Sequence, residues 1–144
     1  MRTFNKLLIS FLILITFLFC ISCKKGGDDS EQAKFYFKIG RNFHEMKDYE
    51  RAIYNLTEAI ELEPDFAEAY LYRGAAYSDV NEYDEAISDF TKAIEINPDY
   101  AEAYFFRGCV YVAEINFTQA CNDFRKSYQL GNKDAHEYIK RLCK

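Results

Sequence analysis

Few side chains in this sequence could take part in covalent chemistry, and their spacing does not favour catalysis or metal binding. The two histidines, His44 and His136, have no second ligand or nucleophile at catalytic or metal-binding spacing, and we expect both to be solvated. The 23 acidic residues fall mainly at helix starts and on outer helix faces, where carboxylates favour solubility and the helix dipole. We therefore predict a protein that is not an enzyme and that needs no metal or cofactor.

The cysteines offer two kinds of chemistry, lipid attachment and disulfide formation. Cys23 follows Ser22 at the end of an apolar run of about 16 residues that starts at Leu7, shorter than the roughly 20 residues that span a bilayer as a helix. Arg2 and Lys6 precede the run. A basic start followed by an apolar core is typical of a secretory signal peptide, so we predict that the protein is exported.

The end of the apolar run resembles the processing site of a bacterial lipoprotein, in which a small residue precedes the cysteine that becomes the lipidated N-terminus. The resemblance implies that residues 1–22 are a signal peptide and that lipid on Cys23 anchors the protein in the membrane of a bacterial cell envelope, on the periplasmic or surface side. Cys20 stands where the lipoprotein signal prefers leucine. The polar residues 23–32 would then be a flexible tether. An uncleaved anchor and an ordinary signal peptide are the alternatives.

Length, composition and charge limit the rest of the chain to one domain and exclude one class of partner. The chain has 144 residues, 49% of them hydrophobic and 17% aromatic, with 6 Gly and 2 Pro, which is typical of a packed helical protein. The formal net charge is -5. A nucleic-acid-binding protein normally shows a basic field that displaces phosphate counterions, so we expect no nucleic-acid partner.

An internal repeat predicts the elements that would position a binding site. The segment "AEAYLYRGAAY" begins at Ala67, and "AEAYFFRGCVY" begins 34 residues later at Ala101. Within the second copy, small and aromatic residues recur at spacings of three and four along two segments separated by "NEYD", which predicts two amphipathic helices and a turn. The period divides the chain into three helical hairpins and a remainder, at residues 33–66, 67–100, 101–134 and 135–144.

The repeat resembles the tetratricopeptide repeat, a family with a period of 34 residues. The matching residues in the three units are Tyr36, Gly40, Phe43, Ala52, Leu56, Ala59 and Pro64; Tyr70, Gly74, Tyr77, Ala86, Phe90, Ala93 and Pro98; and Tyr104, Gly108, Tyr111, Ala120 and Phe124. The resemblance implies an all-α fold, a right-handed superhelix of three hairpins closed by a C-terminal capping helix at residues 135–144. Arg73, Arg107 and Ser127 depart from the family pattern, which has Leu, Leu and Ala at these positions.

The same resemblance implies a concave groove that is lined by the first helix of each hairpin. Its positions, which the repeat pattern leaves free, are Lys34, Phe37, Lys38, Arg41, His44 and Glu45; Glu68, Leu71, Tyr72, Ala75, Ser78 and Asp79; and Glu102, Phe105, Phe106, Cys109, Val112 and Ala113. An exposed row of large apolar side chains usually marks an interaction site. We predict that Phe37, Leu71, Tyr72, Phe105 and Phe106 form such a row.

We expect a peptide or partner protein as the ligand of this groove. Lys34, Lys38 and Arg41 stand at its first-unit end, so the predicted ligand has apolar residues and one acidic end. The aromatic side chains could instead be covered by the chain itself or could pair two molecules into a homodimer. The protein would then be a structural or self-associating envelope lipoprotein, or an assembly factor for envelope complexes.

One activity of the family is not expected here. Some members bind the acidic tails of heat-shock chaperones through a clamp of Lys, Asn, Asn, Lys and Arg. In this sequence the corresponding residues are Phe37, Arg41, Tyr72, Glu102 and Phe106. The clamp is therefore absent, and the resemblance does not imply chaperone binding.

A disulfide is predicted near the C-terminus, because an exported domain meets an oxidising compartment. With Cys23 lipidated, Cys109, Cys121 and Cys143 remain in the mature chain. Cys121 and Cys143 each lie about eleven residues from Asn132, the centre of the turn before the capping helix. Residues equally distant from an antiparallel turn lie side by side, so we predict a Cys121–Cys143 bridge. Three reduced, buried cysteines are the alternative.

Overall fold

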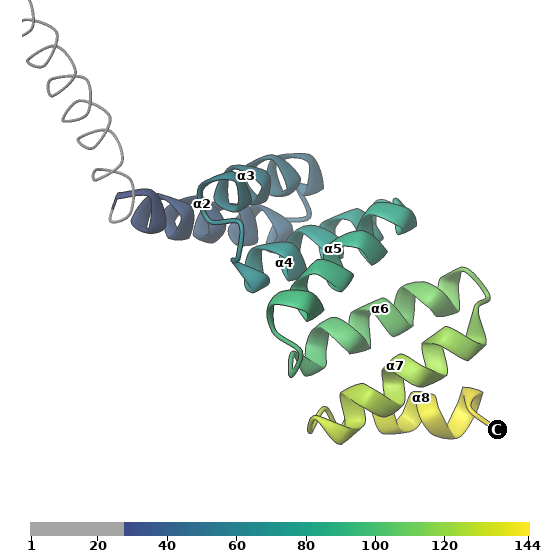
Figure 1. Ribbon diagram of the computed structural model, residues 1–144. Helices are drawn as coiled ribbons and strands as arrows, with labels where there is room; N and C mark the ends of the chain where they lie inside the picture. The colour runs from purple at the N-terminus through teal and green to yellow at the C-terminus, as the bar shows by residue number, and fades with distance from the viewer. Residues whose placement is uncertain (1–27) are drawn as a thin grey trace, which may run out of the picture.

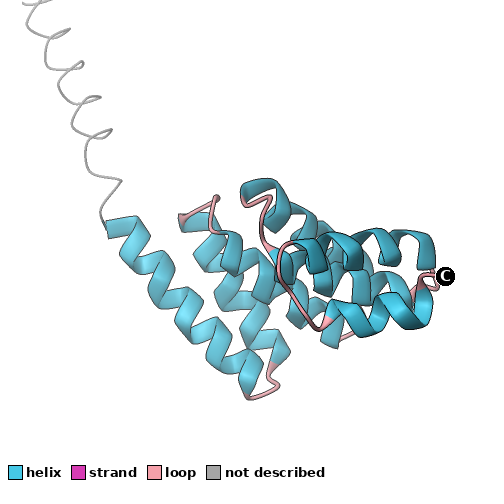
Figure 2. Ribbon diagram, turned by 90° about the horizontal axis from the view of Figure 1, so that it is seen from below, coloured by secondary structure: helices cyan, strands magenta, loops and turns pink. Residues whose placement is uncertain are grey.

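The computed structural model describes residues 28–144, which form seven helices joined by short turns. Figure 1 shows hairpins stacked in chain order, with α2 at one end and α8 at the other, and Figure 2 shows the short loops between the helices. The predicted all-α superhelix is confirmed. Its elements are α2 (Asp28–Glu45) and α3 (Tyr49–Leu62), α4 (Ala67–Asp79) and α5 (Tyr83–Ile96), α6 (Ala101–Ala113) and α7 (Phe117–Gln129), and α8 (Ala135–Leu142).

Glycines set the distance between the two helices of each hairpin. A Cβ atom at Gly74 would lie 2.9 Å from the ring of Phe90, and one at Gly108 would lie 2.8 Å from the ring of Phe124. Both rings are completely buried. Each therefore fills the space that the missing side chain leaves, and Gly40 has the same role in the first hairpin.

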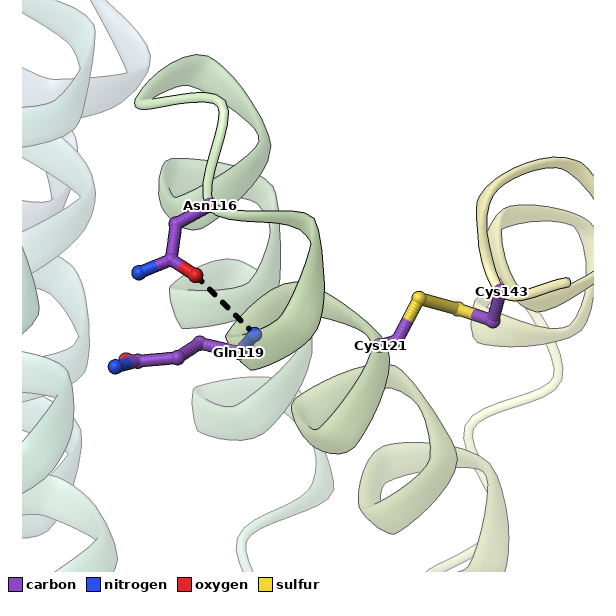
Figure 3. The surroundings of a disulfide bond; sticks show 4 residues. All are labelled: Asn116, Gln119, Cys121 and Cys143. Atoms are coloured by element: carbon purple, nitrogen blue, oxygen red, sulfur yellow. Dashed lines mark hydrogen bonds between the residues drawn. A yellow bond between two sulfur atoms is a disulfide. The ribbon is translucent and has the colours of Figure 1, made fainter.

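The turn inside each hairpin contains one residue with a left-handed backbone. Its φ angle is 60° at Lys47, 65° at Asn81 and 62° at Ile115. Asparagine adopts this conformation readily, whereas a β-branched residue does so only at an energetic cost. In the third hairpin the next helix, α7, begins directly after this turn, and the side chain of Asn116 caps it by accepting a hydrogen bond from the Gln119 backbone nitrogen (Figure 3).

Two buried ion pairs explain the arginines that depart from the repeat pattern. Arg73 on α4 donates to both carboxylate oxygens of Asp89 on α5 at 2.8 Å, and to Thr57 Oγ1 of the preceding hairpin at 3.0 Å. The third hairpin repeats this arrangement 34 residues later, with Arg107, Asp123 and Thr91. Each arginine therefore joins the two helices of its own hairpin and also contacts the hairpin before it.

The substitution of serine at position 127 has a similar explanation. Ser127 is completely buried, and its hydroxyl donates to the carbonyl oxygen of Ala101, the first residue of α6, at 2.7 Å. The polar side chain is therefore satisfied inside the third hairpin.

Helix α8 covers the last hairpin as the capping helix was predicted to do. Ala135 is completely buried, and the ring of Tyr138 lies 4.8 Å from that of Phe124. A disulfide joins Cys121 of α7 to Cys143, directly after α8, with the two Cα atoms 5.5 Å apart (Figure 3).

Helix α2 begins earlier than the sequence analysis placed the domain. It starts at Asp28, so residues 28–32 are helical rather than part of the predicted tether. Ser30 Oγ donates to Glu63 Oε2 at 3.1 Å, and the acidic Asp29 lies in the first turn, where negative charge stabilises a helix. The polar composition of this segment excluded burial, but an exposed helical turn needs none.

The predicted signal peptide, Cys23 and the start of the tether lie outside the described residues. Within residues 28–144 no helix combines the length and the apolar character that a membrane crossing requires.

Candidate functional site

The concave side of the stack contains a pocket, which we call the groove pocket. It has a volume of about 460 Å³ and lies between α2, α4 and α6. Its lining residues are His44, Leu71, Tyr72, Ala75, Ser78, Asp79, Tyr100, Glu102, Phe106 and Cys109. All except Tyr100 are positions that the repeat pattern leaves free on the first helix of a hairpin. The small side chains of Ala75 and Ser78 leave the space that the pocket occupies.

A hydrogen bond across two hairpins forms one side of the pocket. His44 Nε2 on α2 donates to Asp79 Oδ2 on α4 at 3.0 Å. The imidazole also lies edge-on to the ring of Tyr72, with centroids 6.2 Å apart. The His44 side chain is 22% exposed, so the expectation of a solvated surface histidine is wrong. The residue has a structural role at the pocket wall.

The opposite wall is aromatic. Phe106 stacks on the core residue Phe90, with ring centroids 6.0 Å apart, yet 38% of Phe106 stays exposed. Tyr72 is half-buried beside Phe37. Exposed rings that are held in place by a packed core can contact a ligand with little loss of side-chain entropy.

The charged residues that line the pocket are acidic. Asp79 and Glu102 are both exposed, and no lysine or arginine is among the lining residues. Tyr100 reports the same field, because burial raises the pKa of its hydroxyl and the charges of Glu68 and Glu102 raise it further. Burial also raises the pKa of the Cys109 thiol to about 11, so this cysteine is protonated and unreactive at neutral pH.

The structure brings together only part of the predicted site. Leu71, Tyr72, Phe106 and Cys109 line the pocket, whereas Leu71 is only 7% exposed and belongs to the core of the second hairpin. The prediction of an exposed side chain at Leu71 is wrong, because α4 is covered on this side by the neighbouring helices. Leu71 therefore forms the floor of the pocket.

Two of the predicted aromatic residues lie beside the pocket and do not line it. Phe37 packs on Phe66 with ring centroids 4.8 Å apart. Phe105 is turned toward the cap, 5.3 Å from Tyr138 and 5.8 Å from Phe124. The predicted continuous row is thus interrupted, since α8 covers Phe105.

The basic residues of the prediction also lie outside the pocket. Lys34 and Lys38 are exposed on α2, and Arg41 faces Glu45 one turn later, with Nε and Oε1 3.7 Å apart. None of the three lines the pocket.

The lining residue that the sequence analysis missed is Tyr100, the last residue of its repeat unit. It precedes α6 and so approaches the pocket from the loop. The signal for it was available, because Phe66 stands at the same position one period earlier. Among the described residues no group of side chains has the composition and geometry of a metal site.

Comparisons with known proteins agree with this architecture. The sequence matches the tetratricopeptide repeat over residues 67–100 and the related TPR repeat over residues 40–81. A comparison with curated protein sequences gives no match.

Solved structures give the closer relationship. The Arabidopsis OM64 TPR domain is 30% identical, with a TM-score of 0.78 over 80% of this chain and 97% of that one. The TPR2B domain of yeast Sti1, solved in a complex with pHsp70, is 26% identical, with a TM-score of 0.73 over 78% and 94%. The second TPR domain of human RPAP3, solved with an HSP70 peptide, is 29% identical, with a TM-score of 0.71 over 81% and 96%. With these hairpins, this groove and these relatives, the chain belongs to the tetratricopeptide repeat family.

Proposed function

We propose that the protein is an exported, lipid-anchored interaction module that holds an extended segment of a partner protein in the groove pocket. The observation that carries this proposal is the open volume of about 460 Å³, bounded by rings at positions that hairpin packing does not require. The core of the hairpins is complete without the exposed edge of Phe106. An exposed apolar surface inside a concavity is the usual form of a peptide site.

The relatives support a peptide ligand but not its identity. The yeast Sti1 domain and the second human RPAP3 domain were solved with an Hsp70 partner or an HSP70 peptide. This chain has Glu102 and Phe106 in place of two basic residues of the chaperone clamp. We therefore propose the mode of binding and a different ligand.

A peptide-display selection tests the binding activity. A library of random peptides is selected on the wild-type protein, and the recovered peptides are then measured against a variant with Tyr72→Ser and Phe106→Ser. We expect the double variant to lose at least about tenfold in affinity, because burial of each ring against a ligand stabilises by more than 1 kcal/mol.

The matched control is Phe35→Ser with Tyr54→Ser, which removes the same two ring types at sites that are 61% and 62% exposed and lie outside the pocket. The control variant should keep wild-type affinity. Equal binding by all three proteins, or an unfolded circular dichroism spectrum of the pocket variant, would argue against the site.

Export and lipidation need a separate test, since they rest on the sequence of residues 1–23. Mass spectrometry of the protein extracted from membranes should find Cys23 as the first residue, carrying two or three acyl chains. A chain that still begins at Met1, or a mature chain without lipid, would refute this half of the proposal.

A further inference from the structure

The groove pocket has a charge that identifies its ligand more closely. Its exposed acids, Asp79 and Glu102, come from α4 and α6, and Glu68 adds a third carboxylate near the Tyr100 hydroxyl. No lysine or arginine lines the pocket. A negative concavity with a low-dielectric wall attracts cations and repels acidic groups.

These carboxylates are available, unlike the buried acids of the same helices. Asp89 and Asp123 each accept two hydrogen bonds from an arginine. Within residues 28–144 the structure records no ion pair for Glu102, and the recorded partner of Asp79 is His44. The Asp79 side chain is 46% exposed, so it can accept further hydrogen bonds.

Aromatic rings complete the environment of a cation. Tyr72, Tyr100 and Phe106 line the same pocket as the two acids. A Lys or Arg side chain is attracted both by the face of an aromatic ring and by a carboxylate, and its aliphatic stem packs on apolar surface. An acidic side chain gains neither attraction here.

We propose that the groove pocket takes a lysine or arginine side chain from the bound segment, with apolar residues on either side of it. This inference rests on the proposed function, because it names the chemistry of the same ligand. Asp79 and Glu102 bind the cationic group, and Tyr72, Tyr100 and Phe106 contact its stem and the neighbouring residues. It replaces the acidic segment that the positions of Lys34, Lys38 and Arg41 suggested, since these residues lie outside the pocket.

A set of synthetic peptides tests the charge preference. Each probe is a nonapeptide of leucine, phenylalanine and alanine whose central residue is arginine, lysine, norleucine, glutamine or glutamate, and binding to the full-length protein in detergent is measured by fluorescence anisotropy. We expect the arginine and lysine peptides to bind about tenfold more tightly than the norleucine peptide, and the glutamate peptide to bind least. The advantage should shrink as the salt concentration rises.

Two charge-neutralising variants locate the effect. Asp79→Asn with Glu102→Gln should reduce the preference to about twofold or less. The control, Glu61→Gln with Asp99→Asn, removes two exposed acids outside the pocket and should retain the full preference. Bound arginine peptide should also slow alkylation of Cys109, which lines the pocket.

The outcomes separate this inference from the proposed function. Binding of all five peptides with equal affinity, a preference for glutamate, or a basic preference that survives Asp79→Asn with Glu102→Gln would overturn the cationic ligand and leave a peptide groove. Failure of every peptide to bind, together with an unsuccessful display selection, would overturn both.

Discussion

At the scale of single residues, the arginine of each later hairpin is the clearest case of a side chain that depends on its partners. Arg73 and Asp89 are mostly buried, with 17% and 7% of their side chains exposed. Such a pair adds little net stability compared with apolar residues of the same size, but breaking it leaves an unpaired charge inside the protein. The first hairpin shows the neutral solution, because it has Ile39 and Asn55 at the equivalent positions.

This comparison predicts a compensating pair of substitutions. Asp89→Asn alone should reduce the free energy of unfolding by about 3 kcal/mol, since the Arg73 guanidinium loses its charged partner. Adding Arg73→Ile should recover most of this loss, because the double variant reproduces the pair of the first hairpin. Urea denaturation of the single variants and the double variant measures both effects, and a double variant as unstable as the sum of its parts would contradict the explanation.

The turn residue Ile115 supports a second prediction. Its side chain is 74% exposed, so it gains little from packing, and its φ of 62° is unfavourable for a β-branched residue. Ile115→Asn should stabilise the protein by about 1 kcal/mol, because asparagine tolerates the left-handed region.

The second hairpin provides the reverse substitution as a control. Asn81 has nearly the same backbone angle, 65°, so Asn81→Ile should destabilise by a similar amount. Thermal unfolding measures the pair, and a fall in melting temperature with Ile115→Asn would show that the isoleucine has a packing role.

At the scale of elements, the capping helix depends on a covalent link as well as on packing. Helix α8 has 8 residues and one fully buried side chain, Ala135, and a helix this short is marginal without outside contacts. The disulfide spans 22 residues, and closing a loop of this length stabilises by about 3 kcal/mol in the chain-entropy model.

We predict that the protein isolated from the cell contains the Cys121–Cys143 bridge. Peptide mapping without reductant should recover the two cysteines in one linked species, with Cys109 as a free thiol. Reduction should expose the amides of α8 to hydrogen exchange before those of the three hairpins, since the cap loses its link first. Recovery of Cys143 as a free thiol, or linked to Cys109, would contradict the prediction.

The sequence was most informative about these elements where a local pattern determines them. The spacing of Gly74 and Phe90 predicts which helices form a hairpin, and the distances of Cys121 and Cys143 from their turn predict which residues face each other. Burial of Leu71 and Phe105 could not be predicted in the same way. It depends on how closely neighbouring hairpins approach and on how far α8 extends over the last one.

The charge of the site was misjudged for a related reason. Lys34, Lys38 and Arg41 share the groove side of α2 in the repeat pattern, but the pocket forms further along, where α2 contributes only His44. The Arg73–Asp89 pair was within reach of the sequence, because residues one and two are exchanged together between the first and second units.

At the scale of the whole molecule, stacked hairpins place the first helices α2, α4 and α6 on one side and make a single surface from three short segments (Figure 1). Each segment contributes what the others lack: α2 contributes His44, α4 contributes Tyr72 and Asp79, and α6 contributes Glu102 and Phe106. The central claim is that a partner segment binds on this surface.

Chemical-shift mapping tests that claim most directly. A peptide recovered by display is titrated into the isotope-labelled exported form of the protein, and amide and side-chain shifts are followed by nuclear magnetic resonance. The account predicts that the largest changes fall on groove-pocket residues, including Tyr72, Tyr100 and Phe106. Changes confined to the outer helices α3, α5 and α7, or to the exposed end of α2 around Phe35, would contradict it.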